Sequence, residues 1–129
     1  VILGGGSPHN EMIKKYAKNK NIKVVIDADN MSELMLNSDL AIGAGGSTSW
    51  ERCCLGLPTL LYIAAENQRK IAEALEQLGC VIIIKDLKSD LQAIVDNFSS
   101  WETVSSKAQK ICNGLGREKI IHFLEMAID

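Results

Sequence analysis

The chain has 129 residues, of which 47% are hydrophobic and 23% charged, and its formal net charge is -2. This composition is typical of one globular domain and excludes a disordered chain. Lysines and arginines are spread along the sequence, so we expect no nucleic-acid partner. The longest apolar runs, residues 59–65 and 80–84, are far shorter than the roughly 20 residues of a membrane span, and no secretory signal is present. We therefore expect a cytoplasmic protein.

The sequence begins without a methionine, and its first residues, Val1-Ile2-Leu3, already have the pattern of a strand. We therefore expect residues 1–129 to form a single domain that belongs to a longer protein continuing upstream.

The cysteines carry no metal-binding pattern. No C-x-x-C pair occurs, and no histidine lies nearby in sequence to complete a zinc site with the four cysteines, Cys53, Cys54, Cys80 and Cys112. Small thiols of this kind usually pack in a core. We expect free buried thiols, a reducing compartment and no metal.

Short apolar segments alternate with amphipathic helical segments as far as residue 84. The apolar segments predict strands at residues 1–3, 22–26, 40–42, 60–64 and 81–84. Between them, apolar residues at helical spacing predict helices. The first begins at Pro8 with Met12, Ile13 and Tyr16 on one face, the second presents Met31, Leu34, Met35 and Leu36, and the others span residues 48–55 and 66–78, ended by Gly56 and Gly79.

Beyond Lys85 the pattern is wholly helical. Three apolar stripes follow, namely Leu87, Leu91, Ile94, Val95 and Phe98, then Val104, Ala108 and Ile111, then Ile120, Ile121, Leu124 and Ile128. Strands that alternate with helices predict a parallel sheet covered on both faces. The predicted fold class is α/β, a Rossmann-like three-layer domain with a parallel sheet of about five strands and extra C-terminal helices.

Two turns rich in glycine and serine follow the carboxyl ends of predicted strands. One is Gly4-Gly5-Gly6-Ser7, and the other, residues 42–51, reads Ile-Gly-Ala-Gly-Gly-Ser-Thr-Ser-Trp-Glu and opens a helix. Glycines let a backbone approach a ligand closely, and free N–H groups at a helix start favour an anion. We expect both turns to converge on one crevice, although the first alone would equally serve as a plain strand-to-helix connection. Neither matches G-x-G-x-x-G or a P-loop, so NAD and ATP hydrolysis are disfavoured and no cofactor is expected.

Three polar side chains near these turns are candidates for sugar contacts. Glu51 lies one turn into the helix, where its carboxylate would reach both ribose hydroxyls or, alternatively, would pair with Arg52 in solvent. Asn67 and Gln68 follow the fourth predicted strand, and their amides would hold sugar hydroxyls or act as cap and surface residues.

The histidines and tryptophans carry weaker signals. His9 offers a phosphate donor or a general base beside the first turn, but an exposed histidine is the commoner role there. We expect His122 to be structural and Trp50 and Trp101 to pack.

The block Ala44-Gly-Gly-Ser-Thr-Ser-Trp-Glu-Arg-Cys-Cys-Leu-Gly-Leu-Pro-Thr59, followed by Glu66-Asn-Gln68, closely resembles the C-terminal half of the UDP-sugar hydrolases of pseudaminic acid biosynthesis, of the spore coat polysaccharide type. Residues 113–117, Asn-Gly-Leu-Gly-Arg, are similar to the closing segment of that family. More distantly, the chain resembles the donor-binding half of the lipid II N-acetylglucosaminyltransferases. The resemblance covers nearly the whole chain and implies the C-terminal half of a GT-B fold.

This resemblance implies particular binding roles. The diphosphate would be cradled by Gly45, Gly46, Ser47 and Thr48, with Gly6 and Ser7 facing it from the first turn. Glu51 would bind the ribose, Asn67 and Gln68 would face the sugar, and the loop 26–31, ending at Met31, would border the uracil. The chain departs from the family at Pro8 and His9, and its base-side loop 27–30 is longer than in the transferases.

The implied function is binding of a UDP-sugar for hydrolysis that releases the sugar and UDP in nonulosonic acid or surface polysaccharide biosynthesis. The histidine that activates water belongs to the N-terminal half of that family, so we expect no catalytic residue here and the protein's own N-terminal GT-B domain as partner. Two alternatives stay open: the donor-binding domain of a GT-B glycosyltransferase, and a non-catalytic nucleotide-sugar-binding subunit that needs a partner chain.

Overall fold

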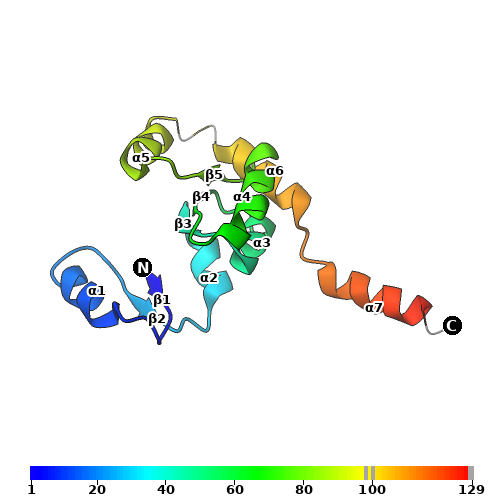
Figure 1. Cartoon of the computed structure of the whole chain (residues 1–129), viewed down its shortest axis with the longest axis horizontal. Helices are drawn as coiled ribbons and strands as arrows, with labels where there is room; N and C mark the ends of the chain where they lie inside the picture. Colours follow the sequence, from blue (N-terminus) through cyan, green and yellow to red (C-terminus); the bar gives the residue numbers. More distant parts are fainter. Residues whose placement is uncertain (98, 100, 128–129) are drawn as a thin grey trace. The chain divides into compact units, whose positions relative to one another are not determined.

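The computed structural model describes residues 1–97, 99 and 101–127. Helices alternate with parallel strands as far as β5 and continue alone beyond it, as the sequence predicts (Figure 1). The chain divides into two compact units, Val1–Leu34 and Met35–Asp129. The single domain expected for the whole chain stays a prediction.

The first unit is small and holds little core. Its elements are β1 (Ile2–Leu3), α1 (Asn10–Ala17), β2 (Val25–Ile26) and most of α2 (Met31–Leu36). β1 pairs in parallel with β2, with Ile2 opposite Val25. Among its residues Ala17 alone is buried.

The prediction for α1 is wrong in two respects. Pro8 precedes the helix, because the Ser7 N–H donates to the Gly4 carbonyl at 3.0 Å and keeps these residues in a turn. Met12 and Tyr16 are 59% and 61% exposed instead of facing a core. A two-stranded ladder offers too little apolar area to cover a helix face. The Tyr16 ring contacts the Lys20 ammonium instead, at 3.4 Å.

The second unit carries the remaining elements. They are β3 (Ala41–Ala44), α3 (Ser47–Cys54), β4 (Thr59–Tyr62), the 3-10 helix η1 (Glu66–Gln68), α4 (Arg69–Gln77), β5 (Ile82–Ile83), α5 (Leu87–Asp96), α6 (Trp101–Ile111) and α7 (Gly116–Met126). β4 lies between β3 and β5 in a parallel ladder, with Leu61 opposite both Gly43 and Ile83.

The strands thus form parallel ladders of two and three strands, and their union in one sheet of five strands stays a prediction. β3 ends later than the sequence predicts, at Ala44 instead of Ile42. Pairing with β4 extends it, since Gly43 lies opposite Leu61 and the Gly45 N–H donates to the Tyr62 carbonyl at 3.1 Å. Tertiary pairing here overrides the low strand preference of glycine.

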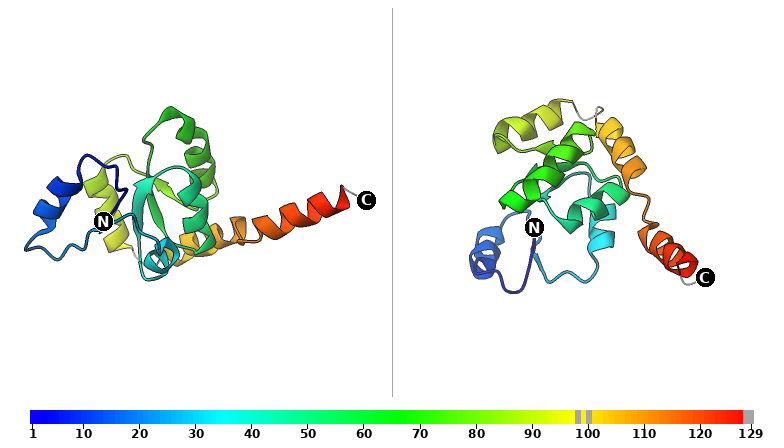
Figure 2. Two further views of the ribbon diagram at one scale, coloured as in Figure 1. Left: turned by 90° about the horizontal axis from the view of Figure 1, so that it is seen from below. Right: turned by 45° about the vertical axis from the view of Figure 1, so that its right-hand side comes forward.

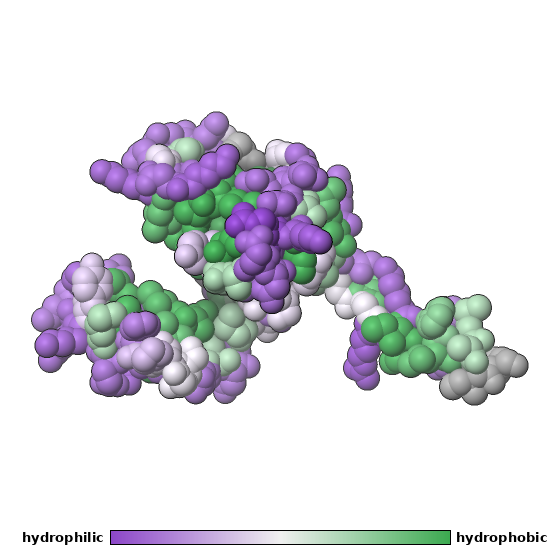
Figure 3. All heavy atoms as spheres, viewed as in Figure 1, coloured by the Kyte–Doolittle hydropathy of each residue, from purple (hydrophilic) through white to green (hydrophobic). Residues whose placement is uncertain are grey.

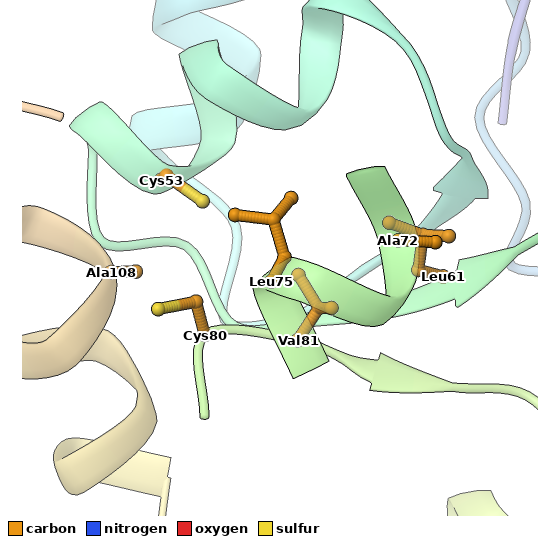
Figure 4. Packing of buried hydrophobic residues seen from close by; sticks show 7 residues of the cluster. All are labelled: Cys53, Leu61, Ala72, Leu75, Cys80, Val81 and Ala108. Carbon is orange, nitrogen blue, oxygen red and sulfur yellow. The ribbon is translucent and has the colours of Figure 1, made fainter. Parts of the chain in front are cut away.

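The core of the second unit lies on both faces of its ladder. Leu60 and Leu61 are fully buried, and successive strand residues point to opposite faces. Leu61 belongs to a cluster with Cys53 of α3, Leu75 of α4 and four further residues (Figure 4). Leu60 packs with Ile94 of α5 and Trp101 of α6. Helices therefore cover both faces, which confirms a three-layer arrangement for this unit (Figure 2).

The last helix forms where its apolar stripe predicts it, and the described residues of this stripe are exposed. α7 contributes no buried residue, and Ile120 and Leu124 are 63% and 54% exposed. Apolar side chains lie on the surface of this helix (Figure 3). His122 on the same helix is also exposed. Phe98 and Ile128, assigned to apolar stripes, lie outside the described residues. Within the described part of the chain, no helix combines the length and apolarity that a membrane crossing requires.

Candidate functional site

The turn between β3 and α3 holds backbone donors that have no hydrogen-bond acceptor among the described residues. Gly46 has φ +148°, a conformation that residues with a side chain rarely adopt, and it is the N-cap of α3. Because glycine has no side chain, it supplies no capping acceptor to the helix. The amides of Ser47 and Thr48 at the helix start therefore have no intrahelical acceptor. Together with the positive end of the helix dipole, they favour an anion at this place.

The backbone N–H of Gly45 cannot donate to a diphosphate, although the resemblance assigns Gly45 to the cradle. Its N–H is used by the Tyr62 carbonyl of β4 and is not available to a ligand. Glycine is favoured at this position because Gly45 is buried between Leu61 and Gln68, where a larger residue would crowd both side chains. Ser47 is exposed and Thr48 is half-buried, so both hydroxyls lie near the surface of the turn. That these residues cradle a diphosphate stays a prediction.

Gln68 is brought directly to this turn. Its Cβ would lie 3.3 Å from a Cβ placed on Gly45. Its Oε1 accepts the Ala64 N–H at 3.0 Å, which fixes the side chain and leaves Nε2 as the group that could donate to a ligand. Asn67 is exposed beside it in η1. The structure therefore brings Gln68 to the turn between β3 and α3, which we call the glycine turn. That Asn67 and Gln68 face a sugar stays a prediction.

Glu51 is exposed in the second turn of α3, and it does not pair with Arg52. Among the described residues no hydrogen bond or ion pair to its carboxylate is formed. Burial lowers the pKa of Arg52, and the charge of Glu51 opposes this shift only in part. The carboxylate is thus accessible, and its contact with a ribose stays a prediction.

Arg52 is a residue of the candidate site that the sequence interpretation did not single out. Its side chain is 5% exposed and lies beneath the glycine turn, where it donates to backbone carbonyls. A charged residue on a helix is normally exposed, so the sequence alone predicts that the Arg52 side chain faces solvent. The available signal was its position next to buried Cys53 and three residues after buried Ser49, on the inner face of α3.

The first glycine turn is held by side chains of its own unit. The Gly5 N–H donates to the Asp27 carboxylate, and a Cβ on Gly5 would collide with that carboxylate. Asn10 Nδ2 donates to the carbonyls of Gly4 and Gly5 at 3.1 and 3.0 Å. Sequence reasoning did not single out either Asp27 or Asn10 for this turn.

The predicted binding residues of the first unit are accessible. Gly6 is exposed, with nothing within 4 Å of an added Cβ, and the half-buried Ser7 accepts the His9 N–H at 3.3 Å. His9 itself is exposed. Met31 is half-buried at the start of α2. The convergence of both turns on one ligand stays a prediction.

The cysteines are free thiols, as predicted, with Cys53 and Cys80 buried and Cys54 and Cys112 half-buried. Burial raises the pKa of Cys53 to about 11, and the neighbouring thiols of Cys80 and Cys112 act in the same direction. A thiol of this kind stays protonated near neutral pH and is a poor nucleophile. Within the described residues no group of histidine, cysteine and acidic side chains is arranged to hold a metal ion.

Residues 1–120 match the Glycosyltransferase family 28 C-terminal domain. The chain belongs to this family. The glycine turn, α3 and Gln68 therefore lie in a family 28 C-terminal domain, and this agrees with the α/β architecture of the second unit.

Curated relatives of this family 28 domain include proteins of two kinds. The chain is 30% identical over 82 residues to the spore coat polysaccharide biosynthesis protein SpsG of Bacillus subtilis (strain 168), a match that covers 63% of the chain and 24% of the relative. It is 31% identical over 108 residues to the UDP-N-acetylglucosamine--N-acetylmuramyl-(pentapeptide) pyrophosphoryl-undecaprenol N-acetylglucosamine transferase of Lactococcus lactis subsp. cremoris (strain MG1363), which covers 80% of the chain and 30% of the relative.

An uncharacterized protein of Methanocaldococcus jannaschii, MJ1062, is 39% identical over 61 residues, covering 47% of the chain and 13% of the relative. The matches thus span less than a third of the length of these relatives. No solved structure matches the chain at a significant level.

Proposed function

We propose that this domain binds the diphosphate and ribose of a UDP-sugar at the turn between β3 and α3. The observation that carries the proposal is the start of α3, where Gly46 leaves the Ser47 and Thr48 amides uncapped. Two converging N–H groups and the helix dipole are suited to a phosphate. Membership of a glycosyltransferase family supports a nucleotide-sugar as the source of that phosphate.

The UDP-sugar would extend from this turn along the surface of the second unit. Glu51, exposed one turn further along α3, would accept the ribose hydroxyls. Gln68 Nε2 and the exposed Asn67 would face the sugar. The roles that the resemblance implies for Gly6, Ser7 and Met31 of the first unit stay predictions. The Lactococcus relative is named for transfer of N-acetylglucosamine from its UDP derivative, which supports UDP as the nucleotide.

The chemistry assigned to this domain is stabilisation of the leaving group. When the bond between the anomeric carbon and the diphosphate oxygen breaks, negative charge develops on UDP, and preoriented backbone donors stabilise that charge. An acceptor oxygen must lose a proton in the same reaction. We place its general base in an N-terminal domain of the whole protein, in a two-domain GT-B enzyme of the cytoplasm.

Both transfer and hydrolysis fit this site. Transfer to a hydroxyl is supported by the names of the transferase relatives. Hydrolysis in nonulosonic acid biosynthesis is supported by the resemblance of residues 44–59 and 66–68 to the UDP-sugar hydrolases. The whole protein incubated with a UDP-N-acetyl sugar and no acceptor distinguishes the two, since rapid release of UDP under these conditions indicates hydrolysis.

Titration of the 129-residue chain with UDP, CMP and ADP, followed by amide NMR, tests the binding proposal directly. We expect the largest shifts at residues 45–51 and 67–68, strongest for UDP. Uridine is the matched control, because it keeps the base and the ribose but lacks both phosphates. Equal indifference to all three nucleotides would overturn the proposal.

A further inference from the structure

Arg52 lies beneath the glycine turn, with its guanidinium bonded to both ends of that turn. Nη2 donates to the carbonyl of Ala44, the last residue of β3, at 2.7 Å, and Nε donates to the carbonyl of Thr48 in α3 at 3.2 Å. Nη2 also reaches the buried Ser49 Oγ at 3.3 Å. A Cβ on Gly43 would collide with Nη1, so glycine at that position makes room for the guanidinium.

In the part of the chain that the structure describes, no carboxylate forms an ion pair or hydrogen bond with this guanidinium, and the exposed Glu51 acts on it only through its charge. The ion pairs formed there join Lys14 to Glu11 and Arg69 to Glu66 and Glu73, all on exposed helix surfaces. Burial lowers the pKa of Arg52, but a guanidinium remains charged at neutral pH. The acceptors around Arg52 are two carbonyls and one hydroxyl, which are all neutral.

A buried charge without a counter-ion destabilises a fold, because the carbonyls restore only part of the lost hydration. The same turn carries the uncapped amides of Ser47 and Thr48. An anion that accepts from these amides would be attracted to the charge of Arg52, which is bonded to the turn at Ala44 and Thr48. Its attraction to the guanidinium would grow with the number of negative charges it carries.

We propose that Arg52 is the fixed positive charge of this anion site and gives it a preference for a diphosphate over a monophosphate. The proposal rests on the proposed function, since it takes the bound anion to lie at the turn. Arg52 acts through the turn and through its electric field, without touching the ligand, and is therefore a positioning residue.

Calorimetric titration of the chain with UDP and UMP tests the proposal, with Arg52→Met and Arg52→Lys as variants. Met removes the charge at similar volume, and Lys keeps the charge without the guanidinium fork. We expect Arg52→Met to lower the UDP affinity about tenfold or more and the UMP affinity less, so that the preference shrinks. Arg52→Lys should keep that preference. Arg117→Met, on the exposed surface of α7, is the matched control and should change neither affinity.

The outcomes of this titration distinguish the proposal that the domain binds UDP from the proposal that Arg52 sets the diphosphate preference. A wild-type chain that binds neither nucleotide overturns the proposed function itself. A wild-type chain that binds UDP, with an unchanged preference in Arg52→Met, overturns the role of Arg52. Equal loss of the preference in Arg52→Lys also overturns it, because the fork alone would then matter. If Arg52→Met does not fold, Arg52→Gln takes its place, because it also removes the charge and still offers amide donors to the two carbonyls.

Discussion

The side chain of Gln68 lies against Gly45, with its Cβ 3.3 Å from the position that a Cβ on Gly45 would occupy. The contact joins the start of α4 to the glycine turn, two segments more than 20 residues apart in sequence. Because Gln68 is fixed by the Ala64 N–H and Leu61 is fully buried, neither neighbour has room to yield. Gly45 is thus required for close packing rather than for an unusual backbone angle.

Gly45→Ala should lower the free energy of unfolding by about 1–3 kcal/mol, the usual effect of one extra methyl group in a packed site. Urea denaturation measures the change. Gly116→Ala is the control, since a Cβ there meets nothing within 4 Å and the residue opens α7. That control should be neutral or slightly stabilising. A Gly45→Ala chain as stable as wild type would contradict the packing argument.

Gln68→Glu separates the structural role of this side chain from its proposed ligand role. The carboxylate can still accept the Ala64 N–H, so stability should change by less than about 1 kcal/mol. The donor Nε2 is lost and a negative charge is placed beside the bound diphosphate. We expect UDP affinity to fall by about 1–3 kcal/mol, measured by calorimetry.

Gln77→Glu makes the same change of charge at an exposed position of α4, away from the turn. It should leave UDP affinity as in wild type. If both variants weakened UDP binding equally, the effect would come from net charge and not from the position of Gln68.

The elements around the site follow from local patterns, and the contacts within it do not. The apolar run before the glycines and the stop at Gly56, with φ +66°, suffice to predict β3, α3 and the turn between them. Gly43 was not expected in the strand, because its pairing with Leu61 is a tertiary contact. The strand propensity of a local sequence does not predict which strand it will pair with.

The burial of Arg52 shows the same limit for the site. A sequence reader assigns an arginine to the surface, since charged residues are almost never fully buried unless they are paired. Here the partners are backbone carbonyls of Ala44 and Thr48, and a carbonyl has no signature in sequence. The contact between Asp27 and Gly5 spans 22 residues and was equally invisible. Side-chain to backbone contacts of this kind require coordinates.

Glu51→Gln tests the ribose contact. The side chain is exposed and no described residue forms a hydrogen bond or ion pair with it, so the free energy of unfolding should change by less than about 0.5 kcal/mol. The affinity for UDP should fall by about 1–3 kcal/mol, since hydrogen bonds from the ribose hydroxyls to a charged acceptor are lost. The affinity for UDP that lacks both ribose hydroxyls should not change.

Glu102→Gln, on the exposed surface of α6, is the matched control for this change. A Glu51→Gln chain that still distinguishes UDP from its dideoxy form as well as wild type does would show that another group holds the ribose.

The stability of the second unit should fall at alkaline pH because of Cys53. Burial, with smaller contributions from Cys80 and Cys112, raises the pKa of this thiol from 9.0 to about 11. Between these values the unfolded chain has released a proton that the folded chain still holds, so unfolding becomes easier as pH rises. The contribution of the thiol is complete below pH 9.0 and is lost as pH passes about 11. The expected loss is about 1–3 kcal/mol.

Urea denaturation at a series of pH values compares wild type with Cys53→Ala. The variant is less stable near neutral pH because of the cavity it leaves, and the difference from wild type should narrow as pH rises from 9.0 toward about 11. Val81→Ala truncates a buried residue of the same cluster without removing a titratable group, so its difference from wild type should stay constant. If the free energies of unfolding of wild type and Cys53→Ala changed in parallel with pH, the thiol would have the same pKa in the folded and the unfolded chain. The burial of Cys53 beside Leu75 and Cys80 would then not control its ionisation.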